Sequence, residues 1–411
     1  MKVVVVGAGA SGLIAAWRAA HLGASVTLLE KTPRIGTKIL ISGGGKCNIA
    51  HDGTVEQVLK AFRRNEALFL RPSFHRFFNK EILAILSAGG LTTYTRPNGR
   101  IFPVDKTAKD VVAILEHTVR EAGVEIRLNC PVLGLVLKDA AITGVRLASG
   151  KLAADRVIVT VGGSSYPGSG TTGDGYPWMK EAGHTIEKIR GALAPIHLVK
   201  DDLRPDLSGV ALRDVIFKAK QGGKEIARWR EDLLFTHHGV SGPCALGISR
   251  EIAENAGKGE VRLEVDCFPT IPNDTLNQQM QAFATKEPKS IWRAFIGDRV
   301  PARILEIILA ECEIPYEAMA GATPKKNRNR LVETLKAWNV GTVRDIPIEK
   351  GEVVAGGVSL DEVDPQTMAS KLVRNLYLAG EILDIAGPVG GYNLQAAYST
   401  GYVAGESAAR G

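Results

Sequence analysis

The sequence predicts an α/β fold with a central parallel sheet, interrupted by a smaller inserted domain. An apolar, β-branched run from Val3 to Val6 leads through a glycine-rich turn into a helical pattern and then to a second strand, Ser25 to Leu29. Buried-strand patterns return at Val157 to Val161 and at Leu376 to Ala379. From about Leu193 the pattern changes to short alternating strands and then to helices, which is typical of a separate domain.

These changes set the expected domain boundaries. Residues 1–192 and 352–411 are expected to form one discontinuous domain, with a basic helical stretch over 55–86. Residues 193–351 are expected to form the insertion, β-rich over 193–271 and helical over 272–351. The chain has 411 residues, 45% of them hydrophobic, which is enough for two or three packed domains and argues against disorder.

Charge and cysteine content narrow the classes of function. The formal net charge of +7 favours anionic ligands such as phosphorylated cofactors and does not require a nucleic acid. The five cysteines form no Cys-x-x-Cys pair and have no histidine at metal-ligand spacing, so we expect no metal site and reduced thiols. The uncharged stretch 386–405 contains Pro388 and several glycines and is a poor membrane span. A cytoplasmic protein without a membrane partner is therefore expected.

The turn after the first strand carries the most informative motif. Gly7, Gly9 and Gly12 match the dinucleotide-binding pattern, in which the glycines allow a tight turn, close approach of a pyrophosphate and close helix packing. Glu30 ends the second strand, where a carboxylate accepts hydrogen bonds from a ribose diol. A second literal match, Gly168 to Gly173, does not directly follow a strand. It is expected to wrap the first cofactor or line its site, and a second, nicotinamide-dinucleotide turn is the alternative.

The loop from Ser42 to Asn48 offers consecutive backbone N–H groups without bulky side chains, which suits an anionic or carbonyl-rich ligand. Lys46 adds a charge. Cys47 is the one cysteine in such a loop, and a nearby positive charge would lower its pKa and make it reactive. The alternative is that Cys47 is a small packing residue.

A third group lies near the end of the chain. A strand followed by Gly380 and Glu381 places a carboxylate against a polyol chain, and a helix that begins near Tyr392 points its positive end at the ligand beyond. For a flavin, that target is the N1–C2=O edge, where reduction places negative charge. The alternative is a surface acid followed by an ordinary helix cap.

In the insertion, His237 and His238 are adjacent. Neighbours on a strand point to opposite faces, so the two cannot share a metal as a helical pair does. His237 is a weak candidate for a proton carrier or substrate contact, and a structural hydrogen bond is the alternative.

Taken together, these motifs resemble the aminoacetone oxidase family of FAD-binding flavoproteins, which also includes a member tied to bile-acid metabolism. The resemblance spans nearly the whole chain. It rests on the segments 7–12 with Glu30, 41–48, 99–103, 161–167, 172–176, 235–237 with 241–243, 356–358, and 379–394. Lys46, where the family often has arginine, and His238, at a variable position, depart from the pattern and leave the choice of substrate open.

The resemblance implies a Rossmann-like FAD-binding domain, built from both chain ends and interrupted by a β-barrel-like and helical insertion. It implies that FAD binds through the following residues: Gly7, Gly9, Ala10, Ser11, Gly12, Glu30, Lys31, Lys38, Ser42, Gly43, Gly44, Asn48, Val132, Gly162, Gly380, Glu381, Gly391, Tyr392, Asn393 and Leu394.

We therefore expect an FAD-dependent oxidoreductase that transfers a hydride between a small organic substrate and NAD(P)H or oxygen through non-covalent FAD. Oxidation of an amine or aminoketone and NAD(P)H-dependent reduction are both compatible with the motifs. Catalytic residues are not identified beyond the weak candidates Cys47 and His237. The alternatives are a flavin-binding redox sensor without turnover and a nucleic-acid-modifying flavoprotein. The sequence disfavours the latter because its basic patches lack interleaved aromatic residues.

Overall fold

The computed structural model describes residues 1–410, which form two compact units. Unit 1 comprises residues 1–189 together with the chain from residue 352 onward, and unit 2 comprises residues 190–351. Among the described residues, no helix is both long and apolar enough to cross a bilayer.

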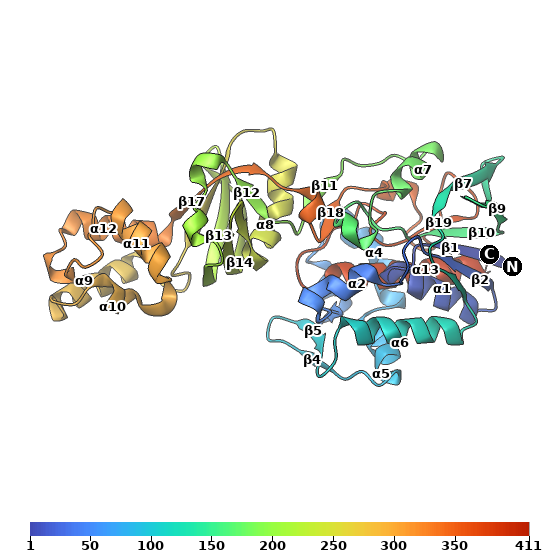
Figure 1. Cartoon of the computed structure of the whole chain (residues 1–411), viewed down its shortest axis with the longest axis horizontal. Helices are drawn as coiled ribbons and strands as arrows, with labels where there is room; N and C mark the ends of the chain where they lie inside the picture. Colours follow the sequence, from blue (N-terminus) through green and yellow to red (C-terminus); the bar gives the residue numbers. More distant parts are fainter. Residues whose placement is uncertain (411) are drawn as a thin grey trace. The chain divides into compact units, whose positions relative to one another are not determined.

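The centre of unit 1 is a parallel sheet in the order β19-β10-β1-β2-β6 (Figure 1). Val3 to Val6 of β1 are all buried, as expected for a strand covered on both faces. The strands are β1 (Lys2–Val6), β2 (Ser25–Leu29), β6 (Glu125–Arg127), β10 (Arg156–Val159) and β19 (Leu376–Leu378). The predicted α/β fold with a parallel sheet is confirmed.

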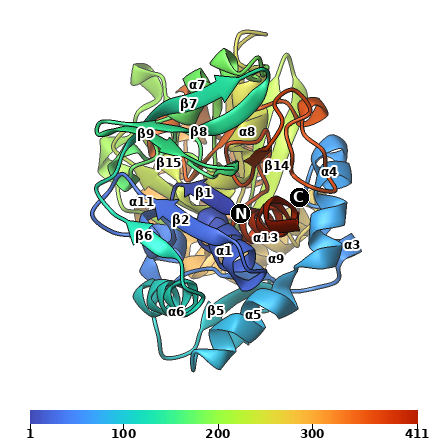
Figure 2. The ribbon, with the colours of Figure 1, turned by 90° about the vertical axis from the view of Figure 1, so that its right-hand side faces the viewer.

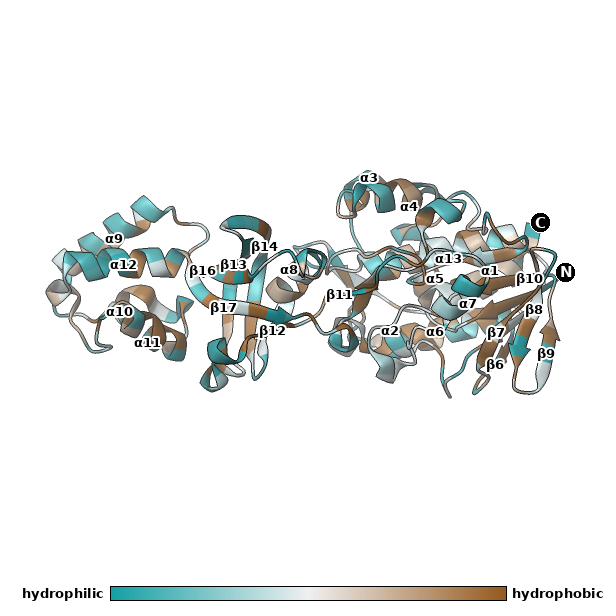
Figure 3. Ribbon diagram, turned by 90° about the horizontal axis from the view of Figure 1, so that it is seen from above, coloured by the Kyte–Doolittle hydropathy of each residue, from teal (hydrophilic) through white to brown (hydrophobic). Residues whose placement is uncertain are grey.

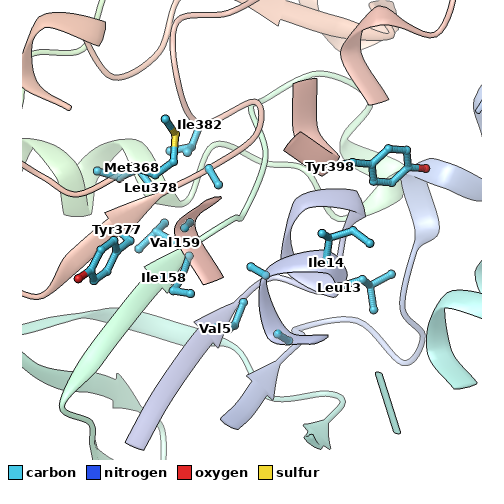
Figure 4. Packing of buried hydrophobic residues seen from close by; sticks show 14 of the residues in the cluster. Val5, Leu13, Ile14, Ile158, Val159, Met368, Tyr377, Leu378, Ile382 and Tyr398 are labelled. Carbon is cyan, nitrogen blue, oxygen red and sulfur yellow. The ribbon is translucent and has the colours of Figure 1, made fainter. Parts of the chain in front are cut away.

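Two helices from opposite ends of the chain, α1 (Ala10–His21) and α13 (Tyr392–Arg410), lie side by side in unit 1 (Figure 2). Their backbones approach closely because α13 carries glycines at the contact. A Cβ atom on Gly401 would lie 2.3 Å from the Ser11 carbonyl oxygen, and one on Gly405 would lie 2.3 Å from the Ala15 carbonyl oxygen. Apolar side chains of β1, α1, β10 and β19 fill the core around these elements (Figure 4). The two chain ends therefore share one core.

The remaining elements of unit 1 surround this core. The expected helical stretch over 55–86 is confirmed and is divided into three helices, the last of which is capped by Glu81, which accepts a hydrogen bond from the Phe78 backbone N–H (2.8 Å). The three helices are α3 (Val55–Leu59), α4 (Arg64–Arg76) and α5 (Asn79–Ala88). The other elements are α2 (Thr37–Ile41), α6 (Ala108–Glu121), α7 (Gly175–Glu181), the sheet β3-β5-β4 (Ala50–His51, Arg100–Pro103, Thr93–Thr95), the sheet β7-β8-β9 (Val132–Lys138, Ala141–Leu147, Gly150–Ala153) and β18 (Val353–Ala355).

Unit 2 contains a closed antiparallel barrel in the order β12-β15-β14-β13-β16-β17. The expectation that residues 272–351 are helical is wrong at the end of that range, where a strand pairs with β12 and β16 and closes the barrel. The barrel strands are β12 (Ile196–Leu198), β13 (Ala211–Gln221), β14 (Lys224–Thr236), β15 (Gly239–Ser241), β16 (Val261–Asp266) and β17 (Trp338–Asp345).

The rest of unit 2 is largely helical, with a short strand, β11 (Arg190–Ala192), at its start. Helix α8 packs on β14, and the helices between β16 and β17 form a cluster in which α11 is apolar and α9 and α12 are more hydrophilic (Figure 3). Their bounds are α8 (Gly242–Asn255), α9 (Asn273–Lys286), α10 (Trp292–Ile296), α11 (Ala302–Glu311) and α12 (Lys325–Lys336).

A buried histidine makes the stability of unit 1 dependent on pH. His184 Nδ1 lies 3.0 Å from Glu362 and Nε2 lies 2.9 Å from the Ser370 hydroxyl. Burial lowers the pKa of His184, although Glu362 opposes this. Below the usual histidine pKa of about 6.5 the unfolded chain therefore binds more protons, so the free energy of unfolding should fall between about pH 7 and pH 5. Denaturant titrations should show a smaller fall in His184→Gln. An equal pH dependence in both proteins would contradict this assignment.

Candidate functional site

The glycine-rich turn joins β1 to α1, and packing within the chain requires two of its glycines. Gly7 has φ of +99°, and a Cβ atom there would lie 2.7 Å from the Thr160 carbonyl oxygen. A Cβ atom on Gly12 would lie 1.8 Å from the Gly7 carbonyl oxygen. These glycines allow the tight turn and the close helix packing that the sequence predicts.

Gly9 differs from its neighbours because nothing in the protein requires a glycine there. Its φ of −81° suits any residue, and a Cβ atom would meet no other atom within 4 Å. This open position lies at the N-terminus of α1, next to Ala10 and Ser11, where backbone N–H groups face outward. The space is therefore suited to the close approach of a pyrophosphate.

Glu30 lies beside this turn. Its carboxylate accepts hydrogen bonds from the backbone N–H of Ala8 (2.9 Å) and of Thr32 (2.9 Å), and each oxygen keeps a further acceptor position. The Cys130 N–H donates to the Glu30 carbonyl oxygen (2.8 Å). This hydrogen bond places the segment that leads to Val132 next to Glu30. Lys31 turns instead to the loop of the second glycine motif, where its Nζ is 2.5 Å from Asp174.

A second cluster joins residues that are far apart in the sequence. Lys38 Nζ from α2 is 2.5 Å from Glu381 and 2.9 Å from the buried Ser165 hydroxyl. Glu381 also accepts a hydrogen bond from the Val354 N–H (3.0 Å). Gly162 and Gly380 adjoin this cluster: a Cβ on Gly162 would lie 3.9 Å from Glu381 and one on Gly380 would lie 2.5 Å from the Ser11 hydroxyl. The cluster is therefore continuous with the start of α1.

The third group surrounds the start of α13. Asn48 accepts a hydrogen bond from the Gly391 N–H (3.0 Å) and donates to the Ala50 carbonyl (3.3 Å). A Cβ on Gly391 would lie 2.5 Å from the Ala50 carbonyl oxygen, so glycine permits this close approach. The Asn393 amide bonds both the N–H and the carbonyl of Gly387 (2.8 Å each). This holds Tyr392, Asn393 and Leu394 as the first turn of α13.

Unit 1 thus brings three predicted groups onto one α/β domain: the glycine turn with Glu30, the Lys38–Glu381 cluster, and the loop 42–48 with the start of α13. In the loop, Ser42 donates to the Ile39 carbonyl (2.7 Å), and Gly43 and Gly44 adopt positive φ. His237 is not part of this group, since it belongs to unit 2. The expectation that the two histidines lie on a strand is wrong, because both occupy the exposed turn between β14 and β15.

The structure does not support Cys47 as a nucleophile. Its side chain is fully buried, and burial raises the pKa of the thiol to about 11 although a hydrogen bond with Ser42 opposes this. A thiol with this pKa is almost entirely protonated at neutral pH, and the protonated form is unreactive. Cys47 is a packing residue beneath the loop.

A labelling experiment checks this conclusion. Iodoacetamide at about pH 7.5 should modify the partly exposed Cys130 and leave Cys47 unmodified in the folded protein. Peptide mass spectrometry before and after unfolding measures both sites. Preferential labelling of Cys47 in the folded protein would show that its thiolate is accessible.

Sequence reasoning missed some polar residues of the site. Ser165 and Asp174 lie in the segment 162–175, whose glycine, serine and threonine content was the available signal. The Thr160 hydroxyl lies 2.8 Å from the carbonyl oxygens of both Val6 and Gly7 and fixes the turn from β10. Its position after an apolar strand gave no sign of this role.

The parallel sheet, the glycine turn and the acid after β2 define a dinucleotide-binding domain. The chain belongs to the HI0933-like protein Rossmann domain family, whose model matches residues 1–407. It is an FAD-binding flavoprotein of the oxidoreductase class. The narrower resemblance to aminoacetone oxidases is not established by these matches.

Two relatives match nearly the whole chain. A 3-dehydro-bile acid delta(4,6)-reductase from Clostridium scindens is 30% identical over 413 residues, which covers 99% of each chain. A ribosomal RNA dihydrouridine synthase from Haemophilus influenzae is 29% identical over 411 residues, covering 99% of this chain and 98% of the relative. Among solved structures, 3-ketosteroid delta1-dehydrogenase from Sterolibacterium denitrificans superimposes with a TM-score of 0.56 at 15% identity, covering 99% of each chain, and shows a shared fold.

Proposed function

We propose that this protein is an FAD-dependent reductase that saturates a carbon–carbon double bond conjugated to a carbonyl group, with NAD(P)H as the hydride source. The observation that carries the proposal is the chemistry shared by the two nearly full-length relatives. One is named for reducing double bonds of a 3-oxo steroid acid, and the other for forming dihydrouridine. Uridine and an unsaturated 3-oxo steroid both contain a C=C bond in conjugation with a C=O group.

Each of the three groups of unit 1 would bind a different part of the cofactor. The glycine turn and Glu30 would hold the adenosine diphosphate half, with Gly9 leaving room for the pyrophosphate. Lys38, Glu381 and the adjacent backbone would hold the polyol chain. The loop 42–48 and the start of α13 would hold the ring system. FAD supplies the two-electron hydride chemistry when it is bound.

The helix dipole at the proposed binding site for the flavin ring would favour the reduced cofactor. The start of α13 places the positive end of a nineteen-residue helix next to the loop that contains Asn48. A negative charge that develops on the ring edge during reduction would be stabilised there. Asn48 and Asn393 fix the backbone geometry so that little reorganisation is needed.

Two substrate classes fit this chemistry. A small unsaturated ketone is the first candidate. A uridine in RNA is the second, favoured by the net charge of +7 and by the relative that acts in the synthesis of dihydrouridine in ribosomal RNA. Binding of RNA would weaken steeply with salt concentration, whereas binding of a neutral steroid would not. Oxidation of an amine or aminoketone, the activity of the family that the motifs resemble, is the competing reaction.

An anaerobic half-reaction experiment tests the proposal. Purified holoprotein is mixed with NADH or NADPH and bleaching of the flavin is followed. The reduced protein is then mixed with 4-androstene-3,17-dione, with uridine monophosphate, or with a uridine-containing ribosomal RNA fragment. We expect bleaching by a reduced pyridine nucleotide and return of the oxidised spectrum with one of the unsaturated carbonyl compounds. Bleaching only by an amine, followed by peroxide formation in oxygen, would contradict the reductase proposal.

A further inference from the structure

A cavity of about 410 Å³ lies in unit 1 beside the start of α13. Its wall is formed by His51, Asp52, Gly53, Gln57, Val58, Gly99 and Tyr392. The cavity is open to solvent, and its lining combines an aromatic ring, an imidazole, an amide and a carboxylate. None of the motifs discussed above uses His51.

The imidazole of His51 is held in one orientation on three sides. Nδ1 lies 2.9 Å from the Gly390 carbonyl oxygen, and because a carbonyl only accepts hydrogen bonds, the proton of the neutral ring is on Nδ1. The ring stacks on Tyr392 with a centroid distance of 4.4 Å and an interplanar angle of 21°. The ring also packs against Gly99, where a Cβ atom would lie 2.4 Å from Nε2. Nε2 is the ring nitrogen that does not contact the Gly390 carbonyl, and it adjoins Gly99, which also lines the cavity.

The cavity is built from the same segments as the ring end of the proposed cofactor site. Tyr392 opens α13 and is itself braced by the edge of Phe62, with a centroid distance of 5.9 Å. His51 ends β3, directly after Ala50, whose backbone abuts Gly391. An oriented imidazole with one nitrogen fixed by a carbonyl is the arrangement that enzymes use for proton transfer.

We infer that the cavity takes the unsaturated carbonyl substrate and that His51 is its proton donor, an inference that rests on the proposed reductase function. Saturation of the double bond needs a hydride at the β-carbon and a proton at the α-carbon. The hydride, which originates from NAD(P)H, brings both electrons, and the proton leaves Nε2 of the imidazolium. In this step the C=C π bond would be lost and two C–H bonds would form, one with the hydride that FAD would supply when bound and one with the proton from His51, which would be left neutral with its proton on Nδ1.

Charged and polar groups surround His51. Asp52 adjoins it in the chain, and Arg100 pairs with it across the β3–β5 ladder. Tyr392 faces it from α13; burial raises the pKa of this tyrosine, and the positive charge of Arg100 opposes that shift. Tyr392 is therefore a neutral stacking partner of His51 at neutral pH.

Stopped-flow measurements on the His51→Gln holoprotein test the inference, with His117→Gln as the control. His117 is an exposed histidine on α6 whose Nε2 lies 3.2 Å from Glu121, and it does not line the cavity. Re-oxidation of the reduced protein by the compound that is active with wild type should slow by about 100-fold or more. Reduction by NAD(P)H should change by less than about 3-fold, because no proton from His51 enters that step.

Nuclear magnetic resonance of the histidine side chains gives a second readout that does not depend on turnover. Addition of 4-androstene-3,17-dione or uridine monophosphate to the oxidised holoprotein should shift the His51 signals and leave those of His117 unchanged. Unchanged re-oxidation rates in His51→Gln would overturn the inference even if the wild-type protein is a reductase. If neither compound re-oxidises wild type, the proposed function fails, and absence of a His51 shift with both compounds would overturn the cavity assignment as well.

Discussion

The Gly12→Ala variant is expected to lose both stability and FAD binding. The added methyl carbon would lie 1.8 Å from the Gly7 carbonyl oxygen and 2.7 Å from the Thr160 hydroxyl, so the turn between β1 and α1 must open. Overpacking of this kind costs about 3 kcal/mol or more, which corresponds to a decrease in Tm of roughly 6–12 °C. Thermal unfolding of the flavin-free protein and FAD titration measure the two effects.

Gly9→Ala is the matched control, because it adds the same methyl group to the same turn at a position where no atom lies within 4 Å. The flavin-free variant should unfold within about 2 °C of wild type, since no contact is disturbed. Its FAD dissociation constant should nevertheless rise by about 10- to 100-fold, because the methyl group occupies the space that a pyrophosphate approaches. Unaltered FAD affinity would show that the pyrophosphate lies elsewhere.

Glu30→Ala is expected to weaken FAD binding by about 2–4 kcal/mol, or roughly 30- to 1000-fold in the dissociation constant. The substitution removes the acceptors proposed for the ribose diol and also the carboxylate that holds the Ala8 and Thr32 N–H groups. Fluorescence titration of flavin-free protein with FAD gives the dissociation constant.

Two further variants help to interpret that result. Glu30→Gln keeps the side-chain size and one acceptor oxygen and should fall between wild type and Glu30→Ala. Glu116→Ala removes an acid from the surface of α6, where it pairs with Arg120, and should bind FAD as wild type does. A Glu30→Ala protein with wild-type affinity would mean that the adenosine end is misplaced.

The N-terminal part of the fold was predictable because its signals are local. The strand predicted over Ser25 to Leu29 coincides with β2, and the glycine turn lies between β1 and α1 as the motif requires. Such βαβ units combine continuous apolar runs with a helical period, so each element carries its own pattern. The fold class and the cofactor class followed from this segment and from the motif near Glu381.

The insertion was less predictable, for physical reasons. Most of β14 is only partly buried or exposed and carries charged residues along its length, so it lacks the clear apolar alternation of a strand. β17 follows a helix-rich stretch and closes the barrel by pairing with strands far away in the sequence. These pairings depend on tertiary contacts, which no local window of sequence contains.

The residues of the site, like the elements of the fold, were predictable only where a local motif marks them. The glycines and Glu30 were found from a motif, but the Lys38–Glu381 contact joins residues that are 343 positions apart, and no local pattern reports it. His51 gave no signal at all, because its orientation comes from Gly390 and Tyr392 at the other end of the chain. Cys47 was a misleading candidate, since its surroundings suggested reactivity while its burial prevents it.

The central claim is that one end of the chain binds the adenosine half of a single FAD and the other end binds its ring system. Calorimetric titration of flavin-free protein with FAD, FMN and NAD tests this directly. We predict one FAD per chain and dissociation constants at least about 100-fold higher for FMN, which lacks the adenosine half, and for NAD, which lacks the flavin ring. FMN or NAD binding as tightly as FAD would contradict the claim.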